Sequence, residues 1–131
     1  MSKYLVKGNE IFNGVIPNYE NARTYSTSEI KVGTWIDGKP IYRKVFSFTT
    51  PTGNTDYVIN TGISMNKIIK VYGGISSASG GITPIPTAID WSGTIYATSL
   101  RAANNNIYYR GNAAYGNQSA YAIIEYTKTT D

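Results

Sequence analysis

The chain consists of short runs in which bulky and polar residues alternate, separated by clusters of Gly, Pro, Asn, Asp and Ser. Alternation with a period of two is typical of strands that bury one face. Helical spacing of Leu, Ala and Glu is nearly absent, whereas Gly and β-branched residues recur throughout. The pattern therefore predicts an all-β domain, built as a sandwich or a barrel.

The clearest predicted element is a hairpin over residues 30–48, because Asp37-Gly38 is a strong two-residue turn signal. Such a turn predicts three cross-strand pairs: Ile36 with Lys39, Thr34 with Ile41 and Ile30 with Val45. One face of the hairpin is then aliphatic, with Ile30, Val32, Ile36, Ile41 and Val45. The other face is aromatic, with Trp35, Tyr42, Phe46 and Phe48. Since a solvated sheet face is polar, we expect both faces to be covered, by the domain core or by another chain.

Other segments fit less uniformly. Strands are predicted within 67–72, 88–100, 107–109 and 119–130, with a turn at Ser92-Gly93. Residues 73–86 are rich in Gly, Ser, Thr and Pro, which predicts a flexible loop. Residues 1–24 form a leader that fits two alternatives, an arm or linker toward another chain segment and a first strand of the sandwich. The sandwich domain itself is predicted over 25–131.

Composition excludes several kinds of site. The 131 residues include no cysteine and no histidine, so disulfides are excluded and the usual general base and commonest metal ligand are missing. Charged residues make up 15% of the chain and the net charge of +4 is scattered, which argues against nucleic acid as a partner. No apolar run approaches the ~20 residues that span a membrane. The N-terminus also lacks the apolar core of a secretory signal.

Enzyme motifs are weak. Ser64 and Lys67 fit S-x-x-K, but that motif needs a helix and an Ile-rich strand follows here. A glycosidase needs two facing carboxylates, and no such pair can be identified among Asp37, Asp56, Asp90 and Glu125. The sequence GGISSASGG lacks the Gly-Lys-Ser/Thr of a phosphate loop. We expect no catalytic activity, no cofactor and no metal.

Three segments resemble one known kind of domain: YSTSEIKVGTWIDGKPIYRKVFSF, DYVINTGISMNKIIKVYGG and the terminal IIEYTKTTD. The domain is found at the C-terminal ends of bacteriophage tail-fibre, baseplate and head-fibre proteins. Residues 25–73 and 119–131 match it in order and spacing. The resemblance implies a virion-surface module at a fibre tip, all-β and commonly trimeric, made in the host bacterial cytoplasm and joined to an upstream fibre or virion protein. It supplies no catalytic motif and no ligand.

The ligand is expected in the region without resemblance, about residues 74–118. A sugar packs its C–H face on aromatic rings, while its hydroxyls bond to amide, carboxylate or guanidinium groups. The chain has 12 Tyr, 3 Phe and 2 Trp set among many Asn, Ser and Thr. The predicted ligand-binding residues are Asp90, Trp91, Tyr96, Asn105, Tyr108, Tyr109 and Arg110. Half of the aromatics at alternating positions should nevertheless belong to the core, and one of the adjacent Tyr108 and Tyr109 must point inward.

Together these features predict a single-domain antiparallel β-sandwich, jelly-roll-like and trimeric. The expected function is host recognition by non-catalytic binding of a bacterial cell-surface saccharide. The alternative is a structural domain that trimerises or caps a phage fibre or head-decoration protein and has no ligand of its own. Neither alternative involves nucleic acid or membrane insertion.

Overall fold

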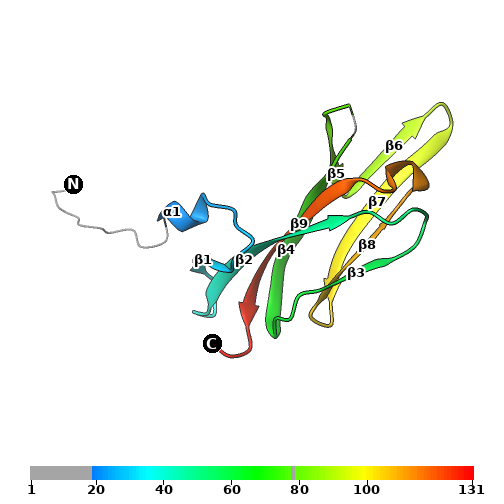
Figure 1. The fold of residues 1–131 in the computed structure, drawn as a ribbon. Helices are drawn as coiled ribbons and strands as arrows, with labels where there is room; N and C mark the ends of the chain where they lie inside the picture. The colour runs from blue at the N-terminus through cyan, green and yellow to red at the C-terminus, as the bar shows by residue number, and fades with distance from the viewer. Residues whose placement is uncertain (1–18, 78) are drawn as a thin grey trace.

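Two antiparallel sheets pack face to face in the computed structural model, which describes residues 19–77 and 79–131 (Figure 1). The five-stranded sheet, sheet A, has the order β1 (Ile30–Thr34), β2 (Pro40–Thr49), β9 (Ser119–Lys128), β4 (Met65–Ser76) and β5 (Ile82–Ile85). The four-stranded sheet, sheet B, has the order β3 (Tyr57–Asn60), β8 (Asn106–Gly111), β7 (Thr94–Ala103) and β6 (Thr87–Trp91). Two short helical turns, α1 (Tyr19–Ala22) and η1 (Ala113–Tyr115), complete the described elements. The prediction of an all-β sandwich is confirmed.

The core lies between the two sheets, where alternate residues of each strand point inward. Sheet A contributes Phe48, Ile75, Ile85, Ala120, Ala122, Ile124 and Tyr126, and sheet B contributes Leu100, Ile107 and Tyr109. The Phe48 ring lies 5.5 Å from the ring centroids of both Tyr57 and Tyr109 and so joins the sheets. Burial of such a cluster is the main favourable term in folding.

The predicted hairpin exists, but its predicted register was wrong. The Trp35 N–H donates to the Lys39 carbonyl over 2.8 Å, and the Gly38 N–H donates to the Trp35 carbonyl over 2.9 Å. These bonds close a three-residue loop in which Gly38 has φ 90°, a conformation that glycine adopts readily. A bulge between Lys31 and Gly33 then shifts the register again, so the partner of Ile30 is Arg43. Ile36 is consequently 91% exposed at the turn instead of lying on a strand face.

The two faces of β2 are covered in different ways. Tyr42, Phe46 and Phe48 point inward and pack in or against the core. Beside β2, the Val45 N–H donates to the Ser26 carbonyl over 2.9 Å, so the segment before β1 runs along the edge of this strand. On the outward face, the Arg43 side chain donates to the Ala22 and Thr24 carbonyls of the same segment. The Tyr25 ring centroid lies 4.4 Å from the Arg43 guanidinium carbon. The outward face is thus covered within one chain at Arg43, whereas Val45 lines a hollow and Ile36 is exposed, so the expectation that both faces are covered is met only in part.

Residues 73–86, predicted as a flexible loop, are largely strand. Gly73 and Gly74 continue β4 and pair with β9, and a turn over 77–81 leads into β5. These glycines occur where the neighbouring strand comes very close. A Cβ at Gly73 would lie 2.1 Å from the Tyr121 carbonyl oxygen, and one at Gly74 would lie 2.7 Å from the Tyr121 hydroxyl. Glycine in a strand here marks close approach, which composition alone could not separate from loop.

The two ends of the sandwich differ. The turn before β5 and the β6–β7 hairpin extend at one end, and α1 lies at the other end beside β1 (Figure 1). Of the predicted leader over residues 1–24, positions 1–18 lie outside the described residues, and Tyr19–Ala22 forms a single helical turn. Within the described ranges, no helix is long and apolar enough to span a membrane.

Candidate functional site

The seven predicted ligand-binding residues all lie in sheet B or its turns, but they do not form one cluster. Asp90 and Trp91 end β6, Tyr96 lies on β7, Asn105 in the β7–β8 turn, and Tyr108, Tyr109 and Arg110 on β8. Cross-strand pairing places Asp90 opposite Ile95, Tyr96 opposite Ile89 and Arg110 opposite Ser99. Alternation along these strands distributes the seven over both faces of the sheet.

Tyr109 points from sheet B into the core. Its side chain is 2% exposed and its ring packs against Phe48, so a ligand in solution cannot contact it. Burial raises the pKa of the Tyr109 phenol. Tyr96 has the same strand parity as the buried Thr98 and is half-buried. The backbone of Trp91 pairs with Thr94, and its side chain lies outside the described part of the structure.

Asp90 and Asn105 stabilise turns. The Asp90 Oδ1 atom accepts a hydrogen bond from the Gly93 N–H over 3.2 Å and holds the β6–β7 turn. Asn105 has φ 64°, and its Oδ1 atom accepts a hydrogen bond from the Met65 N–H over 2.9 Å. The Asn105 carbonyl also accepts the Thr61 hydroxyl over 2.6 Å. Positive φ is tolerated by Asn more than by most residues, so this position is explained by the fold.

Tyr108 and Arg110 point outward from sheet B. The Arg101 guanidinium carbon lies 4.4 Å from the Tyr108 ring centroid, which is the geometry of a cation–π contact. The Arg110 Nη1 atom lies 2.8 Å from Asp56 Oδ1, and both side chains are about half exposed. Exposed ion pairs of this kind stabilise the fold little, so Arg110 and Asp56 are available to a ligand at small cost.

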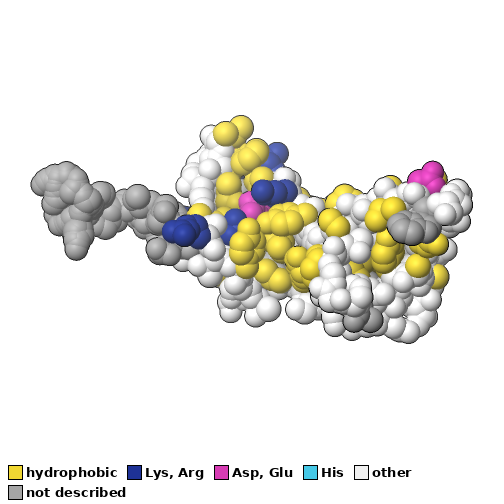
Figure 2. Space-filling view, turned by 90° about the horizontal axis from the view of Figure 1, so that it is seen from above, with side chains coloured by type: hydrophobic (Ala, Val, Ile, Leu, Met, Phe, Trp, Pro, Cys, Tyr) yellow, Lys and Arg dark blue, Asp and Glu magenta, His cyan; other side chains and the backbone are white. Residues whose placement is uncertain are grey.

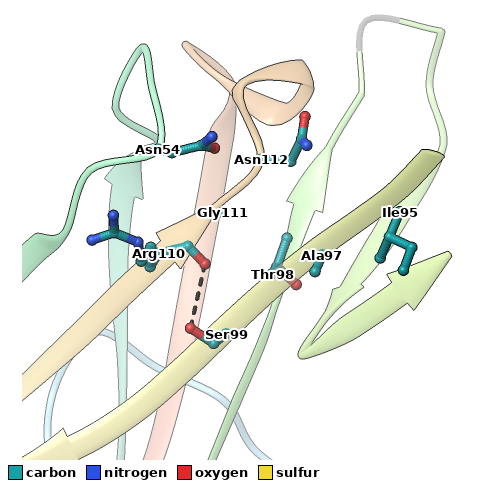
Figure 3. Close-up of a pocket in the computed structure, with 8 residues that line it drawn as sticks. All are labelled: Asn54, Ile95, Ala97, Thr98, Ser99, Arg110, Gly111 and Asn112. Atoms are coloured by element: carbon teal, nitrogen blue, oxygen red, sulfur yellow. Dashed lines mark hydrogen bonds between the residues drawn. The ribbon is translucent and has the colours of Figure 1, made fainter.

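Arg110 lines a groove of about 390 Å³ on this face, shown in Figure 3. The complete lining is Asn54, Ile95, Ala97, Thr98, Ser99, Arg110, Gly111 and Asn112. Asn54 and Arg110 lie on one side of the groove and Ile95 lies on the opposite side (Figure 3). Three separate segments thus meet here, the loop before β3, the β7 strand and the end of β8.

The walls of the groove are held by hydrogen bonds. The Asn112 Oδ1 atom accepts from the Ala114 N–H over 2.8 Å and caps η1, while the Asn112 N–H donates to the Ala97 carbonyl over 2.9 Å. The Ser99 hydroxyl donates to the Arg110 carbonyl over 3.4 Å, drawn as the dashed line in Figure 3. A wall fixed in this way is preorganised, which lowers the entropy cost of binding.

The groove combines planar polar groups with a small apolar surface. Two amides and one guanidinium surround the exposed Ile95 and Ala97 side chains. Amides offer both donors and acceptors, and guanidinium offers donors in a fixed plane. The arrangement suits a ligand that has hydroxyls on its edges and C–H groups on its faces.

Each of the four carboxylates considered for a glycosidase has a hydrogen-bond or ion-pair partner, and no two of them are paired with each other. Asp37 accepts the Lys39 N–H over 3.0 Å, Asp56 pairs with Arg110, Asp90 holds its turn, and Glu125 pairs with Arg43. Ser64 precedes β4, a strand, so the helical context of S-x-x-K is absent at this site. No group of three or more acidic, His or Cys residues that could hold a metal occurs among the residues that the structure describes.

Sequence reasoning missed Asn54, Ser99 and Asn112 as groove residues, and it missed Asp56 as the ion-pair partner of the groove residue Arg110. Asn54 and Asp56 belong to the sequence PTGNTD, which has the composition of a turn, and Asn112 follows the end of β8. Asn54, Asp56 and Asn112 are polar residues in loops, which is where binding residues concentrate, whereas Ser99 lies within β7. Only the strand order β3-β8-β7-β6 brings them together.

Comparison with known proteins gives no relative, since no family model, no curated protein and no solved structure matches the chain. The resemblance to phage fibre domains therefore stays a prediction.

Proposed function

We propose that this chain is a virion-surface module of a bacteriophage that binds a bacterial cell-surface saccharide without cleaving it. The groove on the outward face of sheet B is the proposed contact site. The module would belong to a tail fibre or another surface appendage, be made in the cytoplasm of the host bacterium and be joined to an upstream virion protein.

One observation carries the proposal. Asn54, Arg110 and Asn112 present planar hydrogen-bonding groups around the exposed Ile95 and Ala97 in a preformed groove of about 390 Å³. That volume lies within the range of pockets that hold small ligands. Saccharides need this combination, because their hydroxyls require directed partners and their C–H faces require apolar contact.

The carboxylate positions support the proposal of binding without cleavage. Asp56, the acidic residue bonded to Arg110, contacts a positive charge and has no second carboxylate beside it in the described contacts. Retaining and inverting glycosidases both need two carboxyl groups at ~5–10 Å across the bond that breaks. The groove therefore suits recognition.

The proposed assembly is a trimer, and the sandwich is proposed to be of the jelly-roll-like kind. A single groove gives weak binding, and three copies on one tip would raise the avidity without new contacts. Light scattering tests this directly, because a trimer has three times the 14.3 kDa mass of the chain.

A structural module without a ligand is the second candidate. Large apolar side chains remain exposed, among them Tyr25 at 55% and Ile82 at 58%. In the view from above, hydrophobic side chains cover a broad area over the middle of the molecule (Figure 2). Extended apolar surface of this kind is a mark of protein contact, so a capping or trimerising role would use it.

Glycan-array and whole-cell binding separate the two candidates. Asn54→Ala and Arg110→Met should each weaken saccharide binding about tenfold, since a hydrogen bond to a charged or buried partner is worth on the order of 1.5 kcal/mol. Ile36→Ala, at the exposed turn on the other sheet, is the matched control. If the wild type binds no bacterial glycan and no host cell, the saccharide proposal is overturned and the structural candidate is favoured.

A further inference from the structure

A row of tyrosines lies on the outward face of sheet A, on the other side of the sandwich from the groove. Tyr121 and Ile123 point outward from β9, with Val45 and Tyr72 as the β2 and β4 partners of Ile123. Together with Tyr25 these residues line a hollow of about 430 Å³. Rings with hydroxyl ends therefore surround an aliphatic floor.

Tyr121 lies across its glycine neighbour. Gly74 is the cross-strand partner of Tyr121, and a Cβ built there would lie 2.7 Å from the Tyr121 hydroxyl and 2.9 Å from its Cζ atom. Ile82 Cγ2 would lie 3.1 Å from the same Cβ. A tyrosine over a cross-strand glycine also has a purely structural role, the covering of bare backbone. Tyr121 is only half-buried, however, so part of its ring stays open to solution.

A second hollow adjoins the first and shares Tyr121. Its volume is about 490 Å³, and four hydroxyl side chains line it: Ser47, Thr49, Ser76 and Ser119. All four are exposed, and their hydroxyls make no hydrogen bond within the described part of the chain. Such hydroxyls both donate and accept, and they can rotate to suit a partner.

The two hollows are uncharged. None of the described residues that line them carries a charge. The nearby Arg43 and Glu125 neutralise each other at 3.0 Å, and Tyr25 covers the guanidinium. A charged ligand would gain nothing here, whereas an uncharged ligand with apolar and hydroxyl surfaces matches both hollows.

We propose that these adjoining hollows, which we name the Tyr121 surface, bind a neutral sugar unit. The C–H face of the sugar would pack on Tyr121 and Tyr72, and its hydroxyls would bond to the Ser and Thr side chains. The inference rests on the proposed function, because it takes the ligand class to be a saccharide. It adds a second contact on the opposite face of the domain, so that one copy can engage two chains of a glycan coat and gain avidity.

Binding to an array of neutral bacterial oligosaccharides, followed by ¹⁵N chemical-shift mapping of the labelled full chain with each sugar that binds, tests the proposal. We expect shifts at Tyr72, Tyr121 and Ser119. Tyr121→Ala should weaken neutral-sugar binding roughly three- to tenfold, as expected for loss of one ring contact. Tyr121→Phe, which keeps the ring, should retain most of the binding.

Tyr121→Ala also uncovers Gly74, and we expect it to loosen the sheet locally, so a second set of variants is needed. The pair Thr49→Val and Ser119→Ala removes hydroxyls at exposed positions and should weaken binding with an unchanged near-UV circular dichroism spectrum. Ile36→Ala is the matched surface control.

The pattern of variants separates this inference from the proposed function. One outcome is that Arg110→Met abolishes sugar binding while Tyr121→Ala and Thr49→Val/Ser119→Ala leave it unchanged. That result overturns the proposed binding at the Tyr121 surface and supports the groove. If only the variants of the Tyr121 surface lose binding, the second contact is supported and the proposed binding role of the groove is overturned. The inference is overturned if the wild type binds no neutral sugar. It is also overturned, in favour of contact between copies of the chain, if light scattering shows an increase in mass that depends on Tyr121 and no sugar induces chemical shifts.

Discussion

Arg43 and Glu125 face each other across β2 and β9 on the outward side of sheet A, with Arg43 Nε 3.0 Å from Glu125 Oε2. Each side chain is only 10% exposed. Arg43 Nη1 also donates to the Ala22 and Thr24 carbonyls over 2.9 and 3.2 Å. One arginine thus connects the central strand of the sheet to the segment that enters it.

Removing one partner of this pair should destabilise the domain strongly. Arg43→Leu leaves the Glu125 carboxylate buried without its partner, which costs about 3–5 kcal/mol. The double variant Arg43→Leu/Glu125→Leu should recover a large part of that loss, because no uncompensated charge remains. Urea denaturation of wild type, Arg43→Leu, Glu125→Leu and the double variant measures both effects. A double variant as unstable as Arg43→Leu alone would show that the arginine acts mainly through the Ala22 and Thr24 carbonyls.

Alkaline pH should weaken the fold through Tyr72. Burial, together with a hydrogen bond between Tyr72 and Tyr25, raises the pKa of the Tyr72 phenol to about 12. The unfolded chain has an ordinary tyrosine pKa near 10, so between about pH 10 and 12 the unfolded state binds fewer protons than the folded state. The stabilisation is therefore complete below about pH 10 and is lost as the pH rises toward 12.

Tyr25→Phe tests the cause of that shift. It keeps the ring beside Arg43 and removes the hydroxyl, so the pKa of Tyr72 should fall toward its ordinary value. Carbon-13 NMR of labelled tyrosine Cζ atoms, assigned with Tyr72→Phe, follows the titration of this one phenol. An unaltered Tyr72 titration in Tyr25→Phe would leave burial and the nearby Glu125 charge as the causes.

The local sequence pattern predicted much of this fold, because inward-facing and outward-facing side chains alternate along each strand of a sandwich. The final strand, Ser119–Lys128, alternates Ala120, Ala122, Ile124 and Tyr126 inward, and Ser92-Gly93 gives the β6–β7 turn. The register of the hairpin between β1 and β2 was harder to predict from the sequence. The bulge between Lys31 and Gly33 and the third loop residue depend on contacts that no two-residue motif specifies.

The candidate site was predictable only in part. Arg110 was predicted as a ligand-binding residue, since it is a planar cation near polar loops, and it lines the groove. Tyr109 satisfied the same criteria, yet pairing with Leu100 turns it into the core. Asn54 and Asn112 come from loops far apart in sequence, and only the order of strands in sheet B unites them. Composition indicates which residue types are suited to binding, whereas the order of strands in the sheet determines which of these residues lie close together.

Asn105, predicted as a ligand-binding residue, should prove to be a stability residue. Asn105→Ala loses the bond to the Met65 N–H and places alanine at φ 64°, so the free energy of unfolding should fall by about 1–3 kcal/mol. Asn105→Gly accepts the positive φ and loses only the bond, so its cost should be smaller. Thermal and urea denaturation rank the two variants. Saccharide binding by both should equal that of wild type, and a weakened binding in Asn105→Gly would return this residue to the ligand site.

Gly111 ends β8 under the hydroxyl of a core tyrosine, and the two residues should be energetically coupled. A Cβ at Gly111 would lie 2.1 Å from the Tyr109 hydroxyl and 3.3 Å from Thr98 Cγ2. Gly111→Ala should therefore destabilise the domain by about 1–3 kcal/mol, the usual cost of overpacking. Tyr109→Phe removes the atom that clashes first, so Gly111→Ala should cost less in that background by about 0.5 kcal/mol or more. A urea denaturation cycle over the four proteins measures the coupling. Equal costs in both backgrounds would mean that the alanine Cβ is opposed by the Tyr109 ring or by Thr98 and not by the Tyr109 hydroxyl.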